Sequence, residues 1–97
     1  MVRLDYSADA VADIDEITAF SVEHFGRAVA DDYLTGLEAA CGKLATYPEM
    51  AAIYLRIRPE IRCLTYRSHR IFYRVGAGAV LIVRVLHHAQ DVKRAVS

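Results

Sequence analysis

Arginine and histidine side chains in the second half of the chain are the residues best suited to chemistry. Arginine presents a planar fork of donors that matches phosphate oxygens, and histidine exchanges a proton near neutral pH. Such residues fall in or beside segments that we predict to be strands, namely Arg62, Arg70, Arg84, His87 and His88. This set could contact a phosphodiester, but it is a poor source of a general acid and base. Because His87 alternates with Val85, a structural histidine is the favoured interpretation.

Metal, disulfide and nucleic-acid chemistry are not indicated by the remaining residues. The chain has two cysteines, too few for a disulfide scaffold, and no Cys/His spacing matches a zinc site. Cys41 falls on a predicted apolar helix stripe, so we interpret it as a core residue. Tyr66 and Tyr73 could stack on bases, but core and rim positions are the favoured interpretation. We therefore predict no cofactor, no metal and no direct DNA binding.

Composition predicts one globular domain over residues 1–97, because 55% of the residues are hydrophobic and 25% are charged. The net charge of +0 hides two opposite halves. Residues 1–50 hold ten acidic and three basic residues, and residues 51–97 hold two acidic and nine basic residues, giving −7 and +7. Such a split indicates either a surface for a charged partner or halves that complement each other within the fold.

Export and membrane insertion are not expected. The N-terminal residues lack an apolar segment of signal-peptide length. The longest uncharged apolar stretch, Val75 to Val83, is far shorter than the roughly 18 residues that a membrane span needs. We therefore predict a cytoplasmic protein.

The first half of the chain predicts a strand and two helices. Residues 2–6 alternate like a half-buried strand, and Ser7 can cap a helix over residues 8–24. Gly26 ends that helix, and a second one over residues 27–46 stops before Pro48. On the first helix we expect one face with Val11, Ile14, Ile17, Thr18, Ser21 and Phe25, and the opposite face with Asp9, Asp13, Glu16 and Glu23. The short junction makes the helices an antiparallel hairpin.

The second half predicts three antiparallel strands. Residues 48–59 are irregular or partly extended, and strands follow over residues 61–66, 69–75 and 79–87. Residues 76–78 form a hairpin turn, and residues 91–95 form one helical turn. The fold class is therefore α+β: an N-terminal strand, a helical hairpin that covers one face of the sheet, and a three-stranded antiparallel meander.

Strand alternation predicts an open sheet face that carries arginines. If Leu81, Val83 and Val85 face the helices, then Val80, Ile82, Arg84 and Leu86 face away. On the neighbouring strand, Ile71, Tyr73 and Val75 alternate with Arg70, Phe72 and Arg74. Arg70 is the strongest candidate for contact with a partner.

The order of these elements resembles the ParE/RelE toxin superfamily of bacterial toxin–antitoxin systems. Three segments point to the ParE branch: the hairpin through His24-Phe25-Gly26, the run His69-Arg70-Ile71-Phe72-Tyr73-Arg74-Val75, and Arg84-Val85-Leu86-His87 followed by Gln90-Asp91. In many relatives the segment after Pro48 carries a Gly-Arg pair, whereas here it is Glu49-Met50-Ala51-Ala52.

The resemblance implies a toxin that inhibits DNA gyrase and replication when its ParD-like antitoxin does not bind it. We expect an acidic, amphipathic antitoxin segment on the helical hairpin and the basic sheet. The expected antitoxin- or target-binding residues are Arg58, Arg70, Arg74, Arg84, Phe72, Tyr33 and Leu37. No catalytic residue is expected for this function.

Two alternatives remain open. The first is a ribosome-dependent mRNA endoribonuclease, for which Arg62, Arg70, Arg84 and His87 are the candidate residues. RelE-like enzymes use strand-borne Lys and Arg and often a C-terminal Tyr, but the two lysines here, Lys43 and Lys93, lie outside the predicted strands and no Tyr follows Tyr73. The second alternative is an inert relative that acts as an antidote to other modules.

Overall fold

A computed structural model describes residues 1–55 and 60–90. The elements are β1 (Arg3–Tyr6), α1 (Ala8–Phe25), α2 (Arg27–Thr46), β2 (Ile53–Leu55), β3 (Ile61–Tyr66), β4 (His69–Gly76) and β5 (Ala79–His87). The predicted α+β class, helices and strands are confirmed, and β2 is an additional short strand. The helical turn expected at 91–95 lies outside the described residues.

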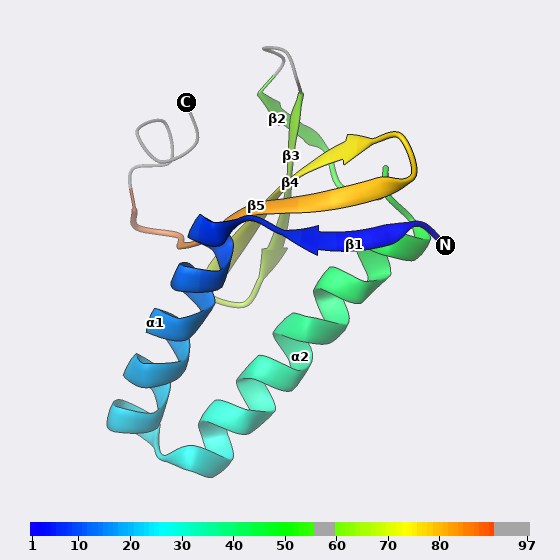
Figure 1. The fold of residues 1–97 in the computed structure, drawn as a ribbon. Coiled ribbons are helices and arrows are strands. Elements are labelled where there is room, and N and C mark those ends of the chain that lie inside the picture. Colours follow the sequence, from blue (N-terminus) through cyan, green and yellow to red (C-terminus); the bar gives the residue numbers. More distant parts are fainter. Residues whose placement is uncertain (56–59, 91–97) are drawn as a thin grey trace.

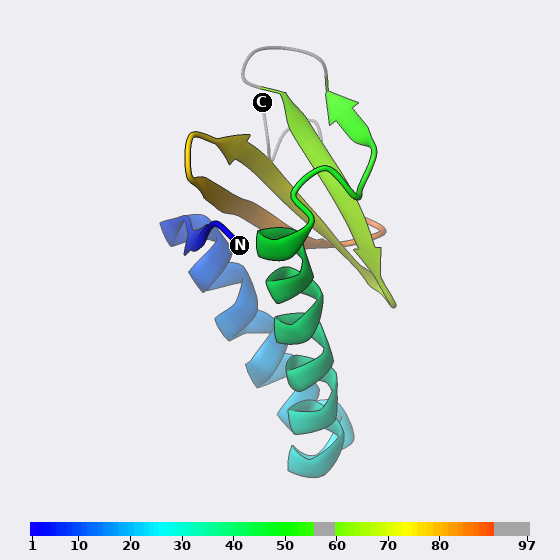
Figure 2. The ribbon, with the colours of Figure 1, turned by 90° about the vertical axis from the view of Figure 1, so that its right-hand side faces the viewer.

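The five strands form one sheet in the order β1-β5-β4-β3-β2. β1 pairs parallel to β5, and the other neighbours pair antiparallel. Both helices cover the same face of this sheet (Figure 2). The end of the hairpin where α1 meets α2 projects beyond the sheet (Figure 1). That overhang leaves part of α1 without a strand beneath it.

Two residues fix the hairpin locally. The Ser7 hydroxyl accepts a hydrogen bond from the Ala10 backbone N–H at 3.0 Å and donates one to the Val83 carbonyl at 2.7 Å, so it caps α1 and ties it to β5. Gly26 separates the helices with φ +84°, a conformation that side chains disfavour. Its backbone N–H donates a hydrogen bond to the Val22 carbonyl and so completes the last turn of α1.

The predicted facing of β5 is wrong for its first half. Val80, Ile82 and Val85 pack into the core beneath the helices, whereas Leu86 packs on the opposite face. The reason is a β-bulge: Tyr73 is opposite Ile82 and Phe72 is opposite Arg84, so Val83 is an extra residue. The bulge resets the alternation, and so the prediction holds for Arg84, Val85 and Leu86, although the Arg84 guanidinium reaches Asp13 of α1.

From the sequence we expected the sheet face away from the helices to be open, but the apolar residues on it are buried. Ile61, Phe72 and Leu86 form a second cluster there, and all three are fully buried. The ring of Tyr54 lies edge-on to Phe72, with 5.3 Å between ring centroids. Arg70 and Arg74 lie on either side of Phe72 on this same face, and both are half-buried.

The predicted face of α1 is also corrected. Its buried residues are Ala10, Asp13, Ile17 and Ser21, whereas Val11 is 48% exposed. Asp13 was expected on the solvent face. It is buried because its carboxylate accepts hydrogen bonds from β5, which offset the cost of removing the charge from water.

Candidate functional site: the groove beneath the helical hairpin

A groove of about 910 Å³ runs between α1, the start of α2 and the far end of β5. One wall is a stripe of α1 that includes Asp9, Asp13, Glu16 and Phe20. Val29 and Tyr33 contribute from α2, and His69, Val85 and His87 contribute from the sheet. In the ribbon, α1 passes the far end of β5 and continues beyond the sheet (Figure 1). Most of the residues that line the groove come from these two elements and from the start of α2.

Large apolar side chains are exposed at the hairpin end of the groove. Phe20, Phe25 and Val29 are 55%, 60% and 53% exposed. Phe20 stacks on His24 with 3.9 Å between ring centroids and lies edge-on to Phe25 at 6.3 Å. A cluster of exposed aromatic side chains beside a groove is typical of a protein-binding surface.

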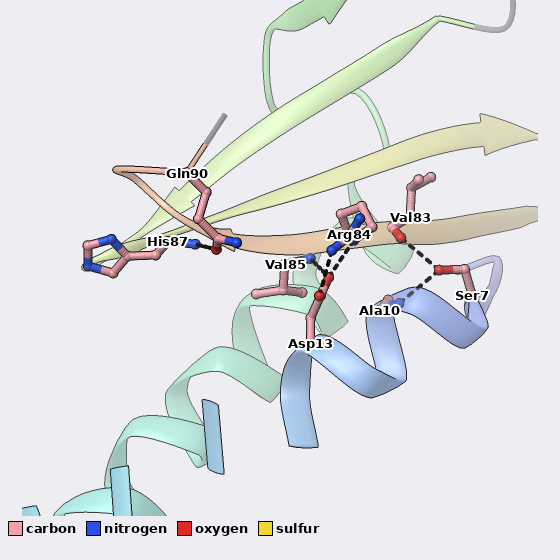
Figure 3. Close-up of polar contacts among 8 residues, drawn as sticks. All are labelled: Ser7, Ala10, Asp13, Val83, Arg84, Val85, His87 and Gln90. Carbon is pink, nitrogen blue, oxygen red and sulfur yellow. Dashed lines mark hydrogen bonds and ion pairs between the residues drawn. The ribbon is translucent and has the colours of Figure 1, made fainter. Parts of the chain in front are cut away.

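Side chains close the free edge of β5 at the floor of the groove (Figure 3). β1 pairs with β5 only as far as Ile82. Beyond it, the Asp13 carboxylate accepts the Val85 N–H at 2.9 Å, and the Gln90 side-chain oxygen accepts the His87 N–H at 2.7 Å. The bond to Asp13 satisfies a strand donor that would otherwise be buried without a partner, whereas the bond between His87 and Gln90 is exposed at the end of the strand.

The same carboxylate holds Arg84. Nε and Nη2 of Arg84 donate to Asp13 at 2.8 and 2.9 Å, a two-pronged ion pair between α1 and β5. The hydrogen bond to Asp13 raises the pKa of Arg84 above its usual value. The guanidinium predicted to face an antitoxin is therefore engaged within the fold by a carboxylate of α1.

Aromatic and imidazole rings form the wall opposite α1. The Tyr33 hydroxyl and Nδ1 of His69 are 2.6 Å apart, and the His69 ring lies edge-on to His87 at 5.5 Å. Burial lowers the pKa of His69, and the nearby His87 and His88 lower it further. The described residues contain no group of three or more His, Cys, Asp or Glu side chains placed to hold a metal ion.

The predicted binding residues occupy different places. Tyr33 and Arg84 line the groove, while Arg70 and Arg74 lie on the opposite sheet face. Nε of Arg74 is buried and has no hydrogen-bond partner among the described residues. Leu37 is only 2% exposed and belongs to the core, as Phe72 does to the second cluster. Arg58 lies outside the described residues.

The residues predicted for RNase chemistry do not converge. Arg62 donates to the Ala51 carbonyl at 2.7 Å on the helix side of the sheet. Arg70 lies on the other face near Cys63. Arg84 is paired with Asp13, and His87 is exposed at the end of β5.

Sequence reasoning missed groove residues on both helices. On α1, Asp13 was assigned to the wrong face and Phe20 was not recognised as exposed; on α2, Val29 was not recognised as exposed. A signal was present for Asp13: Ala10, Asp13, Ile17 and Ser21 recur at spacings of three and four, which places the carboxylate on the buried stripe.

No described helix is both long enough and apolar enough to cross a membrane.

Solved structures of other proteins share this fold. The chain superimposes on a chain of the chromosomal ParDE TA system from P. aeruginosa with a TM-score of 0.77 and 22% identity, covering 90% of this chain and 96% of that one. The isolated E. coli RelE toxin gives a TM-score of 0.62 at 17% identity, covering 97% and 92%. The fold is that of the small α+β toxins that include ParE and RelE.

Sequence comparison identifies the branch. Residues 4–92 match the family described as "ParE toxin of type II toxin-antitoxin system, parDE". Toxin ParE1 of Mycobacterium tuberculosis is 38% identical over 89 residues, which is 91% of each chain. Toxin ParE1 of Caulobacter vibrioides is 36% identical over 87 residues, 90% of each chain. The chain belongs to the ParE family and is the toxin of a type II toxin–antitoxin system.

Proposed function

We propose that this toxin inhibits DNA gyrase and so stops replication, that it catalyses no reaction itself, and that a ParD-like antitoxin holds it inactive in the cytoplasm. Membership of the ParE branch supports gyrase as the target. The observation that carries the non-catalytic part is the scatter of the candidate RNase side chains over both sheet faces and into an internal ion pair.

The chemistry of RNA cleavage explains why this scatter matters. A ribonuclease must place a general base, a general acid and cations around one phosphate. Here Arg62 and Arg70 point to opposite faces of the sheet. Their separation by the sheet favours an inhibitor that works by binding.

The groove is the proposed seat of one antitoxin segment. Its exposed rings and its open shape fit an amphipathic helix or extended segment with apolar anchors. We propose direct antitoxin contacts for Tyr33 and Arg84 in the groove. Arg70 and Arg74 would contact acidic residues of the antitoxin on the opposite face. Leu37 and Phe72 would support these surfaces from the two cores.

Controlled expression in a bacterial host tests the proposal. Induction should stop nucleotide incorporation into DNA before amino-acid incorporation into protein, and co-expression of the antitoxin encoded beside the toxin should restore growth. If protein synthesis stops first and mapped mRNA ends show cleavage that Arg70→Ala or His87→Ala abolishes, the ribonuclease alternative is correct. Normal growth during expression would instead indicate an inert relative.

A further inference from the structure

The groove wall on α1 has two chemically different ends. Asp9, Asp13, Glu16 and Phe20 line the groove at spacings of four, three and four residues, so they form one stripe along the helix. The stripe is acidic over its first turns and aromatic where it reaches Phe20. Asp9 and Phe20 are about 16 Å apart along the helix axis at 1.5 Å per residue. A bound segment of a few helical turns would meet both ends.

The acidic end has an excess of negative charge. Among the described residues, three carboxylates, Asp9, Asp13 and Glu16, line the groove there with one guanidinium, that of Arg84. Asp13 engages Arg84, and together with Asp9 and Glu16 it raises the pKa of Arg84. Asp9 and Glu16 are exposed, and neither takes part in an ion pair of the described residues. Within the described fold these two groove carboxylates therefore have no ion-pair partner, and the Arg84 guanidinium near them is already engaged by Asp13.

We infer that the antitoxin segment in the groove is basic at one end and apolar at the other, with Lys or Arg against Asp9 and Glu16 and apolar side chains against Phe20, Phe25 and Val29. This inference rests on the proposed function and specifies the chemistry of the partner. It separates two parts of the antitoxin. A basic and apolar segment occupies the groove, and acidic residues face Arg70 and Arg74 on the other side of the sheet. An entirely acidic segment would be repelled from the groove wall.

Charge neutralisation with a matched control tests the inference. The antitoxin encoded beside the toxin is titrated against the wild type, against Asp9→Asn with Glu16→Gln, and against Asp15→Asn with Glu23→Gln. Both double variants remove two exposed carboxylates from α1, but Asp15 and Glu23 do not line the groove. The groove variant should bind about 3- to 10-fold more weakly at low salt, and the difference should fade at high salt, where exposed charges are screened. The control should bind like the wild type.

The variant Phe20→Ala, titrated in the same way, tests the apolar contact. Its affinity should fall by about tenfold or more at both salt concentrations, because the loss of an aromatic anchor is not screened by ions. Circular dichroism and thermal melting of each variant show whether it is folded.

The outcomes separate the inference from the function on which it rests. If the groove variant binds as tightly as the control or more tightly, the segment is not basic and the inference is wrong. If sedimentation shows that the toxin alone forms a dimer that the groove substitutions abolish, the occupant is a second copy, and the inference is also wrong. If the wild type does not bind the antitoxin at all, the proposed function itself fails.

Discussion

Asp13 joins α1 to β5 through three hydrogen bonds, two from Arg84 and one from the Val85 backbone N–H. Asp13→Ala would leave the guanidinium without its carboxylate and a buried strand donor without an acceptor. We expect a loss of about 2 to 3 kcal/mol in the free energy of unfolding, measured by urea denaturation. Asp13→Asn should lose less, because an amide oxygen can still accept from Val85.

Asp15→Ala is the matched control for this prediction, because Asp15 is exposed on the same helix. It should change stability by no more than about 0.5 kcal/mol. An effect of Asp13→Ala as small as that of the control would contradict the role assigned to Asp13.

His69 makes stability depend on pH. Burial lowers its pKa below the usual 6.5, so the folded state favours the neutral ring that lies 2.6 Å from the Tyr33 hydroxyl. The stabilisation is therefore complete above pH 6.5 and is lost as the pH falls through the lowered pKa, where folding must exclude a proton that the unfolded chain binds. Urea midpoints between pH 8 and pH 5 should fall on acidification in the wild type.

The urea midpoint of the His69→Gln variant should fall less over the same pH range, because glutamine does not titrate. His87 and His88, which lie next in the row of rings, remain in both proteins and so cancel in the comparison. An equal loss of stability in wild type and His69→Gln would show that His69 is not the group responsible.

At the scale of the element, α2 approaches β3 where it carries Gly36. A Cβ at this position would meet the Tyr66 hydroxyl, which donates to the Tyr33 carbonyl at 2.9 Å. Gly36→Ala should therefore reduce the free energy of unfolding by about 1 to 3 kcal/mol through overpacking.

Gly42→Ala on the same helix is the control, since a Cβ there meets nothing within 4 Å. It should stabilise the protein by about 0.5 to 1 kcal/mol through the higher helix propensity of alanine. Thermal melting of both variants measures the contrast. Similar effects of the two substitutions would contradict the close approach of α2 to Tyr66.

The elements were predictable because the sequence marks their ends. Ser7 caps the start of α1, and Gly26, with its positive φ, separates the two helices. Pro48 has no backbone N–H to donate and follows the end of α2. The bulge in β5 was not predictable in this way. Residues 79–83 are apolar without interruption, so alternation does not distinguish the two faces, and only pairing with β4 reveals the extra Val83. β2 has only three residues and depends on its pairing with β3.

At the scale of the whole molecule, both interpretations of the charge asymmetry hold in part. The ion pairs Arg84–Asp13 and Arg67–Asp32 join the basic half to the acidic half. Other charges lie on separate surfaces: Asp9 and Glu16 are exposed at the groove, and Arg70 and Arg74 are half-buried on the opposite face of the sheet. Sequence reasoning identified the arginines but not the groove, because α1 and β5, which form it together, are far apart in the sequence.

We propose that this ParE-family toxin acts on gyrase by binding alone. The decisive experiment incubates purified gyrase, relaxed plasmid and ATP with increasing amounts of the toxin. We predict that supercoiling falls as toxin is added and returns when the antitoxin is supplied in equal amount. Undiminished supercoiling at a large excess of folded toxin, with cleavage of mRNA by the same preparation on translating ribosomes, would contradict the claim.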